Sequence, residues 1–325
     1  MILCARCAST ERQILNRSGR KGEIHMQTVP RDQIQFRFDP SFSPVMEISS
    51  GDTIRFECQD CYAEQLTEDG MEFGRMDMRR NNPITGPVCV REAAPGDILK
   101  VEILGIELKD HGVMCVRTGK GIYEVEGCHC RRFPILDDTI RFDKDLDIPI
   151  RPMIGVIGTC PTEPEATQVP GEHGGNLDIR ELGIGSTVYL PVAVPGANLS
   201  MGDIHAVQGD GETAICGMEC SGTVTVRVTV LKDRHDIPTP FVVSGKSCYT
   251  TAAHESLDTC HVAAARKMHR FLMDQAHLSD AQAAMLLSLC GNLRITQVVN
   301  PRKGCMMEFP LEVLERLGAE TDLLK

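Results

Sequence analysis

The sequence predicts an α+β fold that is mainly β, with β-sandwich or barrel-like N-terminal and central parts and a C-terminal α/β portion. Short stretches in which apolar and polar residues alternate, the pattern of half-buried strands, continue to about residue 235. Gly-containing turns separate these stretches, as they do in sandwiches and barrels. Helical periodicity begins only after residue 255.

The β pattern begins near Gln33, where Ile34, Phe36 and Phe38 alternate with polar residues. A Gly-containing turn followed by Asp or Ser and alternating apolar residues then recurs in residues 50–56, 95–103, 185–190 and 202–205. Gly supplies unusual turn dihedrals, and Asp or Ser bonds the local backbone. The spacing of these units is irregular, so they indicate turn chemistry and not a solenoid.

The C-terminal region contains the predicted helices. From residue 256 to about 275, one helical face carries apolar side chains and a histidine: Leu257, His261, Ala264, Ala265, Met268, Phe271 and Leu272. Ser279 followed by Gln282 forms a capping box for a second helix, and Gly291 ends it. A strand is predicted over residues 295–299. Pro310 opens a last short helix that Gly318 closes.

These patterns divide the chain into four parts. Residues 1–25 are basic and polar without apolar periodicity, and we expect a disordered tail, with Met26 as an alternative start. Residues 26–150 are predicted to form a β-rich N-terminal domain. Residues 151–235 are predicted to form a β-rich domain with polar, Gly-rich loops, and residues 236–325 a helical α/β portion.

Charge and hydropathy restrict the partners. The 325-residue chain has 45 acidic and 34 basic side chains and a net charge of -11, so it lacks the basic surface that nucleic acids or anionic lipids attract. No apolar run approaches the ~20 residues that span a bilayer. The N-terminal residues lack the pattern of a secretory signal. We therefore expect a cytoplasmic protein without nucleic-acid or membrane partners.

The 15 cysteines are expected to be mostly reduced, because the chain is long and lacks an export signal. Three local pairs occur: Cys4 with Cys7, Cys58 with Cys61, and Cys128 with Cys130. A structural zinc site needs two well-spaced pairs with turn residues between them. Free cysteine is also among the most buried residue types, so small core residues are the favoured interpretation.

The densest polar and Gly-rich stretch lies between residues 171 and 219. If residues 203–208 form a strand, Asp203 and His205 point to the same face. A carboxylate beside an imidazole is half of a divalent metal site of the Zn²⁺ type. The alternative is a structural pair in which Asp203 only fixes the His205 tautomer. The surrounding glycines, which let backbone approach a ligand, favour the metal site.

Several motifs occur together in this chain: residues 82–88 (NPITGPV), 95–99 (PGDIL), 170–178 (PGEHGGNLD), 185–192 (GSTVYLPV), 196–212 (GANLSMGDIHAVQGDGE) and 293–300 (LRITQVVN). The motifs occur in the same order as in the acetamidase/formamidase family, which the chain resembles from about residue 27 to residue 317. It departs from the family's pattern at Cys58 and Cys61, which flank Asp60, and at Ile204.

The resemblance implies hydrolysis of formamide, acetamide or a similar short amide to a carboxylate and ammonia. It implies a divalent metal held among Asp60, His173, Asp203, His205 and Glu219. This donor set favours zinc, whereas calcium, the alternative, prefers oxygen ligands alone.

The resemblance also implies roles for other polar groups. Glu212 or Asp178 is the candidate base. The backbone amides of Gly174 and Gly175, together with Asn176, are candidates for binding the substrate and its developing oxyanion. We expect a homodimer.

Two alternatives remain open at this stage. One of the cysteines, for example Cys216 or Cys220, could attack the amide, although both lie in an apolar strand pattern that favours burial. A non-catalytic β-rich binding protein would explain the strands, but it would not explain the clustered Gly, His, Asp and Glu residues.

Overall fold

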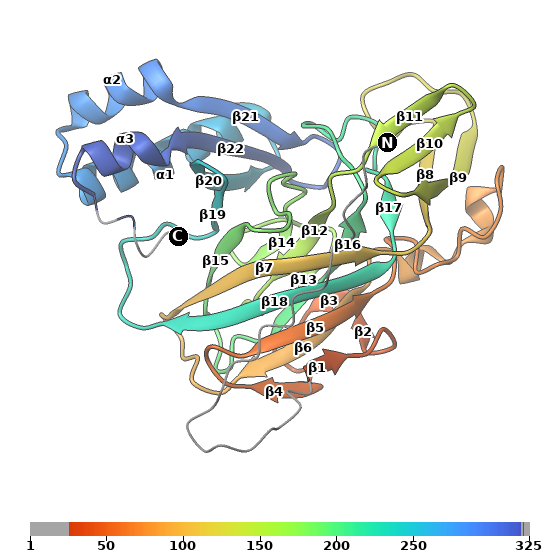
Figure 1. The fold of residues 1–325 in the computed structure, drawn as a ribbon, viewed down its shortest axis with the longest axis horizontal. Helices are drawn as coiled ribbons and strands as arrows, with labels where there is room; N and C mark the ends of the chain where they lie inside the picture. The colour runs from red at the N-terminus through yellow and green to blue at the C-terminus, as the bar shows by residue number, and fades with distance from the viewer. Residues whose placement is uncertain (1–25, 320, 322–325) are drawn as a thin grey trace, which may run out of the picture.

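The computed structural model describes residues 26–319 and residue 321. Two large sheets dominate it, with helices gathered at one end (Figure 1). The first sheet has nine strands in the spatial order β1 (Gln27–Val29), β5 (Thr53–Cys58), β18 (Gly222–Leu231), β7 (Ile98–Leu108), β15 (Thr187–Pro191), β19 (Phe241–Ser244), β20 (Ser247–His254), β22 (Lys303–Pro310) and β21 (Asn292–Gln297).

The second sheet has eleven strands and carries the Gly-rich loops. Its main path runs through β11 (Leu146–Pro149), β10 (Thr139–Asp143), β9 (Cys128–Leu136), β8 (His111–Arg117), β17 (Glu219–Cys220), β16 (Leu199–His205), β12 (Met153–Gly158) and β14 (Gly174–Asn176). Beside this main path, β6 (Ile84–Val90) pairs with β16. It also pairs with β2 (Ile34–Gln35) and β4 (Met46–Ile48). A separate pair joins β3 (Arg37–Phe38) to β13 (Glu165–Ala166), and two 3-10 turns lie at η1 (Phe73–Arg75) and η2 (Met78–Arg80).

The main core lies between the two sheets. Fully buried side chains of β5 and β18, such as Phe56 and Val224, share one apolar cluster with Ile154 of β12 and with Met201 and Ile204 of β16. The alternation read from the sequence produces this arrangement, because every second side chain of β5 points into the sandwich. The prediction of a mainly β, α+β fold is confirmed.

The helices cover one face of the first sheet. α1 (Leu257–Ala276) packs on β20 and β22 with its buried side chains Cys260, Ala264, Met268, Phe271 and Leu272. α2 (Asp280–Cys290) begins at the predicted capping box of Ser279 and Gln282 and ends at Gly291. α3 (Leu311–Arg316) follows Pro310 as predicted. None of the described helices combines the length and the apolar character needed to cross a lipid bilayer.

Some element boundaries differ from the predicted ones. The first predicted strand is split, because β2 pairs with β6 whereas β3 pairs with β13. The predicted strand 295–299 begins earlier, at Asn292, where pairing with β22 starts. The tail 1–25, with Cys4 and Cys7, lies outside the described residues.

The predicted ranges 26–150 and 151–235 share both large sheets. For example, β18 pairs with β5 and β7, and β16 pairs with β6. The described α-helices all fall within residues 236–325. The division of the chain into domains stays a prediction.

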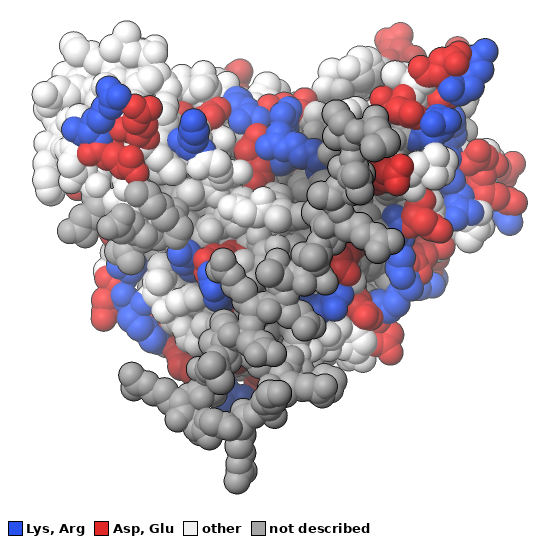
Figure 2. Space-filling view, in the orientation of Figure 1, with Lys and Arg blue, Asp and Glu red and all other residues white. Residues whose placement is uncertain are grey.

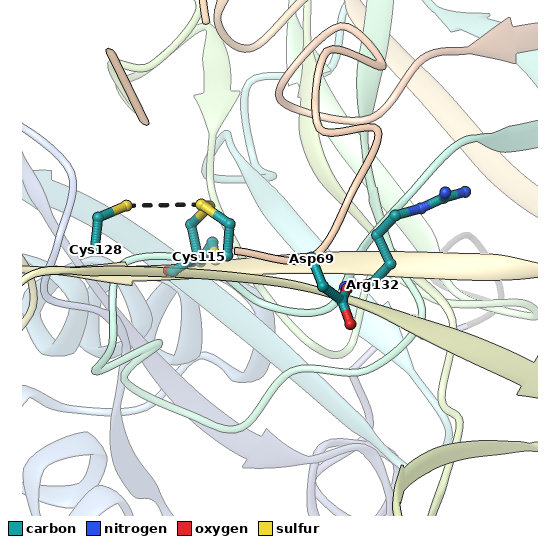
Figure 3. Close-up of a disulfide and its surroundings, with 6 residues drawn as sticks. Asp69, Cys115, Cys128 and Arg132 are labelled. Atoms are coloured by element: carbon teal, nitrogen blue, oxygen red, sulfur yellow. Dashed lines mark hydrogen bonds between the residues drawn. A yellow bond between two sulfur atoms is a disulfide. The ribbon is translucent and has the colours of Figure 1, made fainter. Parts of the chain in front are cut away.

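One disulfide occurs among the described cysteines, and sequence reasoning did not foresee it. Cys115 of β8 and Cys130 of β9 face each other in the antiparallel register and are bonded. The Cys128 sulfur lies 3.7 Å from that of Cys130 (Figure 3). In the same region, Asp69 accepts the backbone N–H of Arg132 at 2.7 Å (Figure 3). This hydrogen bond fixes the loop that contains Asp69 against β9. Eleven other described cysteines are unpaired.

Charge is unevenly spread over the visible face. Acidic and basic side chains are interspersed over the lobe formed by β8 to β11, whereas few charged side chains lie over the lobe that carries α2 (Figure 2).

Candidate active site

The site begins at the end of β16, where Asp203 and His205 lie beside Glu219 of β17. The antiparallel register places His205 opposite Glu219. The His205 Nε2 atom lies 3.1 Å from Glu219 Oε1 and 3.4 Å from Asp203 Oδ1. Asp203 and His205 therefore meet as the sequence predicted, although the strand ends at His205 and does not continue to residue 208.

Two loops complete the cluster around His205. Asp178 follows β14, and Glu212 lies in the loop between β16 and β17. Ligand atoms of Asp178, His205 and Glu212 all lie within 4.8 Å of one another. A second group within the same limit joins Asp203 and Glu219 to Cys61. The two groups form one acidic cluster around a single imidazole, which we call the His205 cluster: Cys61, Asp178, Asp203, His205, Glu212 and Glu219.

The His205 cluster is buried, and many of its polar atoms have no hydrogen-bond partner. Each cluster residue is at most 7% exposed. Buried atoms without a hydrogen bond are Asp178 Oδ1, Asp203 Oδ1, His205 Nε2, Glu212 Oε2 and Glu219 Oε2. Orphaned buried polar atoms are costly, and five in one place are explained by a cation that they would share. The donor set of carboxylates, one imidazole and one thiol fits a divalent metal of the zinc type.

Two glycines make room for this cluster. Gly155 of β12 lies between the paired residues Ile154–Ile204 and Val156–Gly202, opposite Asp203. A Cβ atom on Gly155 would lie 2.6 Å from Asp203 Oδ2 and 2.7 Å from Asp178 Oδ1. A Cβ atom on Gly217 would lie 2.6 Å from His205 Nδ1. A side chain at either position would displace the functional groups.

The backbone is strained at three of the acids. Asp178, Asp203 and Glu212 have φ angles of +47°, +56° and +42°, in the left-handed region that side-chain-bearing residues seldom adopt. Such strain costs on the order of 1–3 kcal/mol per residue and concentrates at functional sites. It aims three carboxylates from three different segments at one point.

Gln208 fixes the orientation of the His205 ring. The Gln208 amide nitrogen donates to the Asp178 carbonyl at 2.9 Å, so its Oε1 atom faces His205 Nδ1 at 2.7 Å and accepts the proton there. The lone pair of the neutral ring is then on Nε2, which faces Asp203 and Glu219. The tautomer-fixing partner is thus Gln208, and Asp203 is left on the ligand side of the ring.

Burial and mutual repulsion shift the pKa values of the cluster. Burial, followed by the neighbouring Asp203 charge, raises the pKa of Asp178 to about 6. Burial and the Asp178 charge raise the pKa of Glu212 well above its usual range. Burial also raises the pKa of Glu219 to about 8. Burial alone would lower the pKa of His205, but the Glu219 and Asp203 carboxylates outweigh it and raise that pKa. The cluster therefore attracts protons or another cation.

A cavity of about 340 Å³ opens onto the cluster. Asp203, Glu212 and Glu219 line it, together with Asn82 and Asn176. Its other lining residues include Phe73, Met78 and Val299, which are apolar, and Arg117 and Lys120, which are basic. The cavity volume is at the lower end of the range for small-molecule sites.

Two residues of the predicted metal set lie outside the His205 cluster. The Asp60 carboxylate accepts the backbone N–H groups of Tyr62 and Glu64, at 2.9 and 3.0 Å, and so stabilises the turn after β5. His173 packs edge-on against Phe38 with 4.9 Å between ring centroids. Burial, followed by the nearby Arg302 charge, lowers the pKa of His173 to about 4. Of the five predicted ligands, the structure brings together Asp203, His205 and Glu219.

Of the three predicted substrate-binding residues, one lines the cavity and two do not. Asn176 lines the cavity, and its Oδ1 atom is buried without a hydrogen bond, so it can accept a substrate N–H. The Gly174 amide donates to the Gly171 carbonyl at 3.2 Å. Gly174 and Gly175 pair with β12 and are not among the cavity-lining residues. Their role as oxyanion donors stays a prediction.

Sequence reasoning missed four polar contributors: Cys61, Asn82, Gln208 and Asn300. Asn300 donates to Asp178 Oδ2 at 2.6 Å, and Asn82 lines the cavity with a φ of +58°. Cys61, Asn82 and Asn300 lie far from His205 in the sequence, so spacing carried no signal for them. Asn82, Gln208 and Asn300 do lie within the recognised motifs 82–88, 196–212 and 293–300, and this position was the signal that could have found them.

The two candidate cysteine nucleophiles are poorly placed to ionise. Burial raises the pKa of Cys216 to about 12, and its thiol donates to the Cys115 carbonyl at 3.4 Å. Burial also raises the pKa of Cys220 to about 12. Cys216 does line the cavity, but its nearest ionisable neighbours include carboxylates, which disfavour a thiolate.

Comparison with known proteins shows which family this chain resembles in sequence and fold. The Acetamidase/Formamidase family profile matches residues 23–164 and 156–316. The crystal structure of an acetamidase from Bacillus halodurans is 41% identical, with a TM-score of 0.88 over 90% of this chain and 100% of that one. A recombinant predicted acetamidase/formamidase from Thermoanaerobacter tengcongensis is 36% identical, with a TM-score of 0.87 over 90% of this chain and 98% of that one. The formamidase of Methylophilus methylotrophus is 28% identical over 62% of this chain and 65% of its own length.

Proposed function

This chain belongs to the acetamidase/formamidase family, and we propose that the His205 cluster is the centre at which it hydrolyses short aliphatic amides. The reaction consumes one water and yields a carboxylate and ammonia. The observation that carries the assignment of the centre is the convergence of five orphaned buried polar atoms at the end of the 340 Å³ cavity.

An amide resists water because resonance stabilises its carbonyl and its nitrogen is a poor leaving group. A catalyst must therefore activate the water, supply a proton to nitrogen and stabilise the developing oxyanion. Asp203, His205 and Glu219 would hold a divalent metal, because His205 Nε2 lies 3.4 Å from Asp203 Oδ1 and 3.1 Å from Glu219 Oε1, and Asp178 and Cys61 lie beside them. When bound, such a metal polarises the carbonyl and lowers the pKa of water.

We assign the proton transfer to Glu212. Both Glu212 and Asp178 have a free oxygen, but Glu212 lines the cavity, whereas Asp178 is not among the lining residues and its Oδ2 atom accepts from Asn300 at 2.6 Å. Glu212 would take a proton from the attacking water at Oε2 and return it to the amide nitrogen as the C–N bond breaks. Asn176 Oδ1 would accept an N–H of the substrate and so fix which face of the amide meets the cluster.

Zinc is the metal we propose first, because an imidazole and a thiol stand among the donors. Calcium, which prefers oxygen ligands, is the alternative. Metal analysis of the purified protein by mass spectrometry distinguishes them.

The central test combines metal content with ammonia release from formamide and acetamide. His205→Ala and Asp203→Ala should each lose metal and turnover while retaining the circular dichroism of the wild type. Asp39→Asn is the matched control, since Asp39 is an equally buried acid, 5% exposed, that bonds Ser41 away from the cluster. A folded His205→Ala protein with normal metal content and turnover would exclude the cluster as the centre.

The cysteine mechanism has its own test. Cys216→Ser should keep substantial turnover if Glu212 and the metal perform the chemistry. Complete loss of turnover in a folded Cys216→Ser protein that retains its metal, with a covalent acyl adduct on the wild type, would establish the thiol as nucleophile.

We also propose a cytoplasmic homodimer. Four exposed apolar side chains on α2 and the edge strand β21 support self-association: Met285 (64% exposed), Leu289 (82%), Leu293 (47%) and Ile295 (42%). Light scattering on wild-type protein and on Leu289→Glu should show a dimer and a monomer, respectively. A monomeric wild type would refute the homodimer.

A further inference from the structure

Two basic side chains in the wall of the active-site cavity have no acidic partner. Arg117, at the end of β8, and Lys120, in the following loop, both line the 340 Å³ cavity. Among the described residues, no carboxylate lies within ion-pairing distance of either one. Several other arginines of this acidic chain are paired, as Arg227 is with Glu102 at 2.7 Å. We call Arg117 and Lys120 the basic pair.

Arg117 is held in place by packing. Its guanidinium carbon lies 4.0 Å from the centroid of the Phe73 ring, and its Nε atom is buried without a hydrogen bond. A guanidinium stacked on an aromatic ring keeps its in-plane N–H groups free for a carboxylate. The arrangement therefore presents a pre-oriented donor that no described group satisfies.

The cavity has an acidic end and a basic end, so it suits a substrate whose amide and anionic groups are separated. Glu212, whose Oε2 atom is free beside the proposed metal ligands Asp203 and Glu219, would repel a carboxylate placed against it. A neutral amide group can meet these acids, while an anionic group on the same molecule meets the basic pair. The apolar side chains of Phe73, Met78 and Val299, which also line the cavity, suit intervening methylene groups.

The size of the cavity agrees with a substrate larger than formamide. A water molecule takes about 30 Å³, and formamide has only three non-hydrogen atoms. A cavity of about 340 Å³ therefore has room for a chain of several carbons beyond the amide.

Resting on the proposed amide hydrolysis, we infer that the basic pair binds a carboxylate of the substrate, so that the preferred substrates are monoamides of short dicarboxylic acids. The amide lies at the His205 cluster and the distal carboxylate at Arg117 and Lys120. Hydrolysis of such a monoamide yields a dicarboxylate and ammonia.

The test compares succinamate with 4-oxopentanamide, in which a methyl ketone replaces the carboxylate and the number of non-hydrogen atoms is unchanged. The readout is the ratio of kcat/KM for succinamate to that for 4-oxopentanamide, from ammonia release. We expect a ratio of about 10 to 100 for the wild type, the usual effect of a charge-assisted hydrogen bond. Malonamate and glutaramate then report the preferred chain length.

Arg117→Met should lower this ratio toward one, while methionine keeps a contact with Phe73. Lys120→Met should lower it less, because Lys120 is exposed, and this substitution leaves the packing intact if Arg117→Met folds poorly. Lys246→Met, an exposed lysine in the turn between β19 and β20, is the control that should leave the ratio unchanged.

The outcomes separate this inference from the proposed function. Suppose that acetamide and 4-oxopentanamide are hydrolysed. If the wild-type ratio is then near one, or if both variants keep the wild-type ratio, the basic pair does not select a carboxylate. The proposed amide hydrolysis still stands in that case. If no amide releases ammonia, amide hydrolysis fails. Calorimetric binding of succinamate to wild-type and Lys120→Met protein then still decides the inference, with equal affinities overturning it.

Discussion

Gly155→Ala tests whether the crowding around the carboxylates sets the geometry of the site. Gly155 faces Asp203 across the β12–β16 pair, and it does not have a positive φ, so its backbone angles suit alanine. The added methyl group would lie 2.6 Å from Asp203 Oδ2, 2.7 Å from Asp178 Oδ1 and 2.8 Å from the backbone carbonyl oxygen of Asp203. Because the two carboxylates belong to the proposed metal centre, the substitution acts on the site without altering any functional group.

The size of the effect follows from these distances. Ordinary contact begins at 3.4 Å, so the Asp203 carboxylate must move by roughly 0.8 Å, and strands β12 and β16 must separate by roughly 0.6 Å at the Asp203 carbonyl oxygen. A misplacement of about 1 Å at a catalytic centre costs on the order of 100-fold in rate. Overpacking of this kind lowers the free energy of unfolding by about 1–3 kcal/mol, which a domain of this size should tolerate. We therefore expect a folded protein with kcat/KM for acetamide reduced about 100-fold.

The assay measures ammonia release, metal content and the urea midpoint of unfolding on the same preparations. Gly105→Ala in β7 is the matched control, since its methyl group would meet only Thr225 at 3.8 Å, an ordinary contact. It should behave as the wild type in all three measurements. Gly155→Ala with wild-type kcat/KM and metal content would show that the carboxylates near Gly155 are not the catalytic centre.

Three further predictions follow from residues outside the proposed metal centre. The first tests the alternative cysteine mechanism, and the other two test ion pairs that stabilise the fold. Iodoacetamide should leave most turnover, because burial raises the pKa of Cys216 to about 12; complete inactivation that substrate prevents would contradict this. Asp97, despite partial burial, has a lowered pKa because Lys232 at 2.6 Å and a backbone N–H stabilise its charge. Its contribution to stability is therefore fully present above the unfolded pKa near 3.8 and disappears as pH falls through the lower folded value, so Asp97→Asn should cost most stability at pH 7 and progressively less as pH falls below about 3.8, as thermal melts would show. Arg294→Met should lower the free energy of unfolding by about 1–3 kcal/mol, because it removes the closest of three ion-pair partners of the buried Glu181, at 2.9 Å, and leaves Arg151 and Arg180 at 3.6 Å; a urea denaturation curve like that of the wild type would refute this.

The helical part of the fold was readable from sequence because its signals are local. Ser279 and Gln282 form a capping box within one turn, and the helix ends at Gly291. Such contacts depend on dihedral preferences and hydrogen bonds between near neighbours, which the order of residues specifies directly. The alternation along β5 is equally local, and it correctly indicated which side chains face the core.

The sequence alone determined a mainly β fold with C-terminal helices, and it pointed to Asp203 and His205 as neighbours. Only the tertiary structure decided that Glu212 and Asp178 join them and that Asp60 instead bonds the backbone of its own turn. The physical reason is that side-chain convergence from separate segments depends on strand register and on backbone angles such as the positive φ of the site acids. The disulfide between the paired strands β8 and β9 arises in the same way, since spacing along the chain does not specify which residues a register places opposite each other.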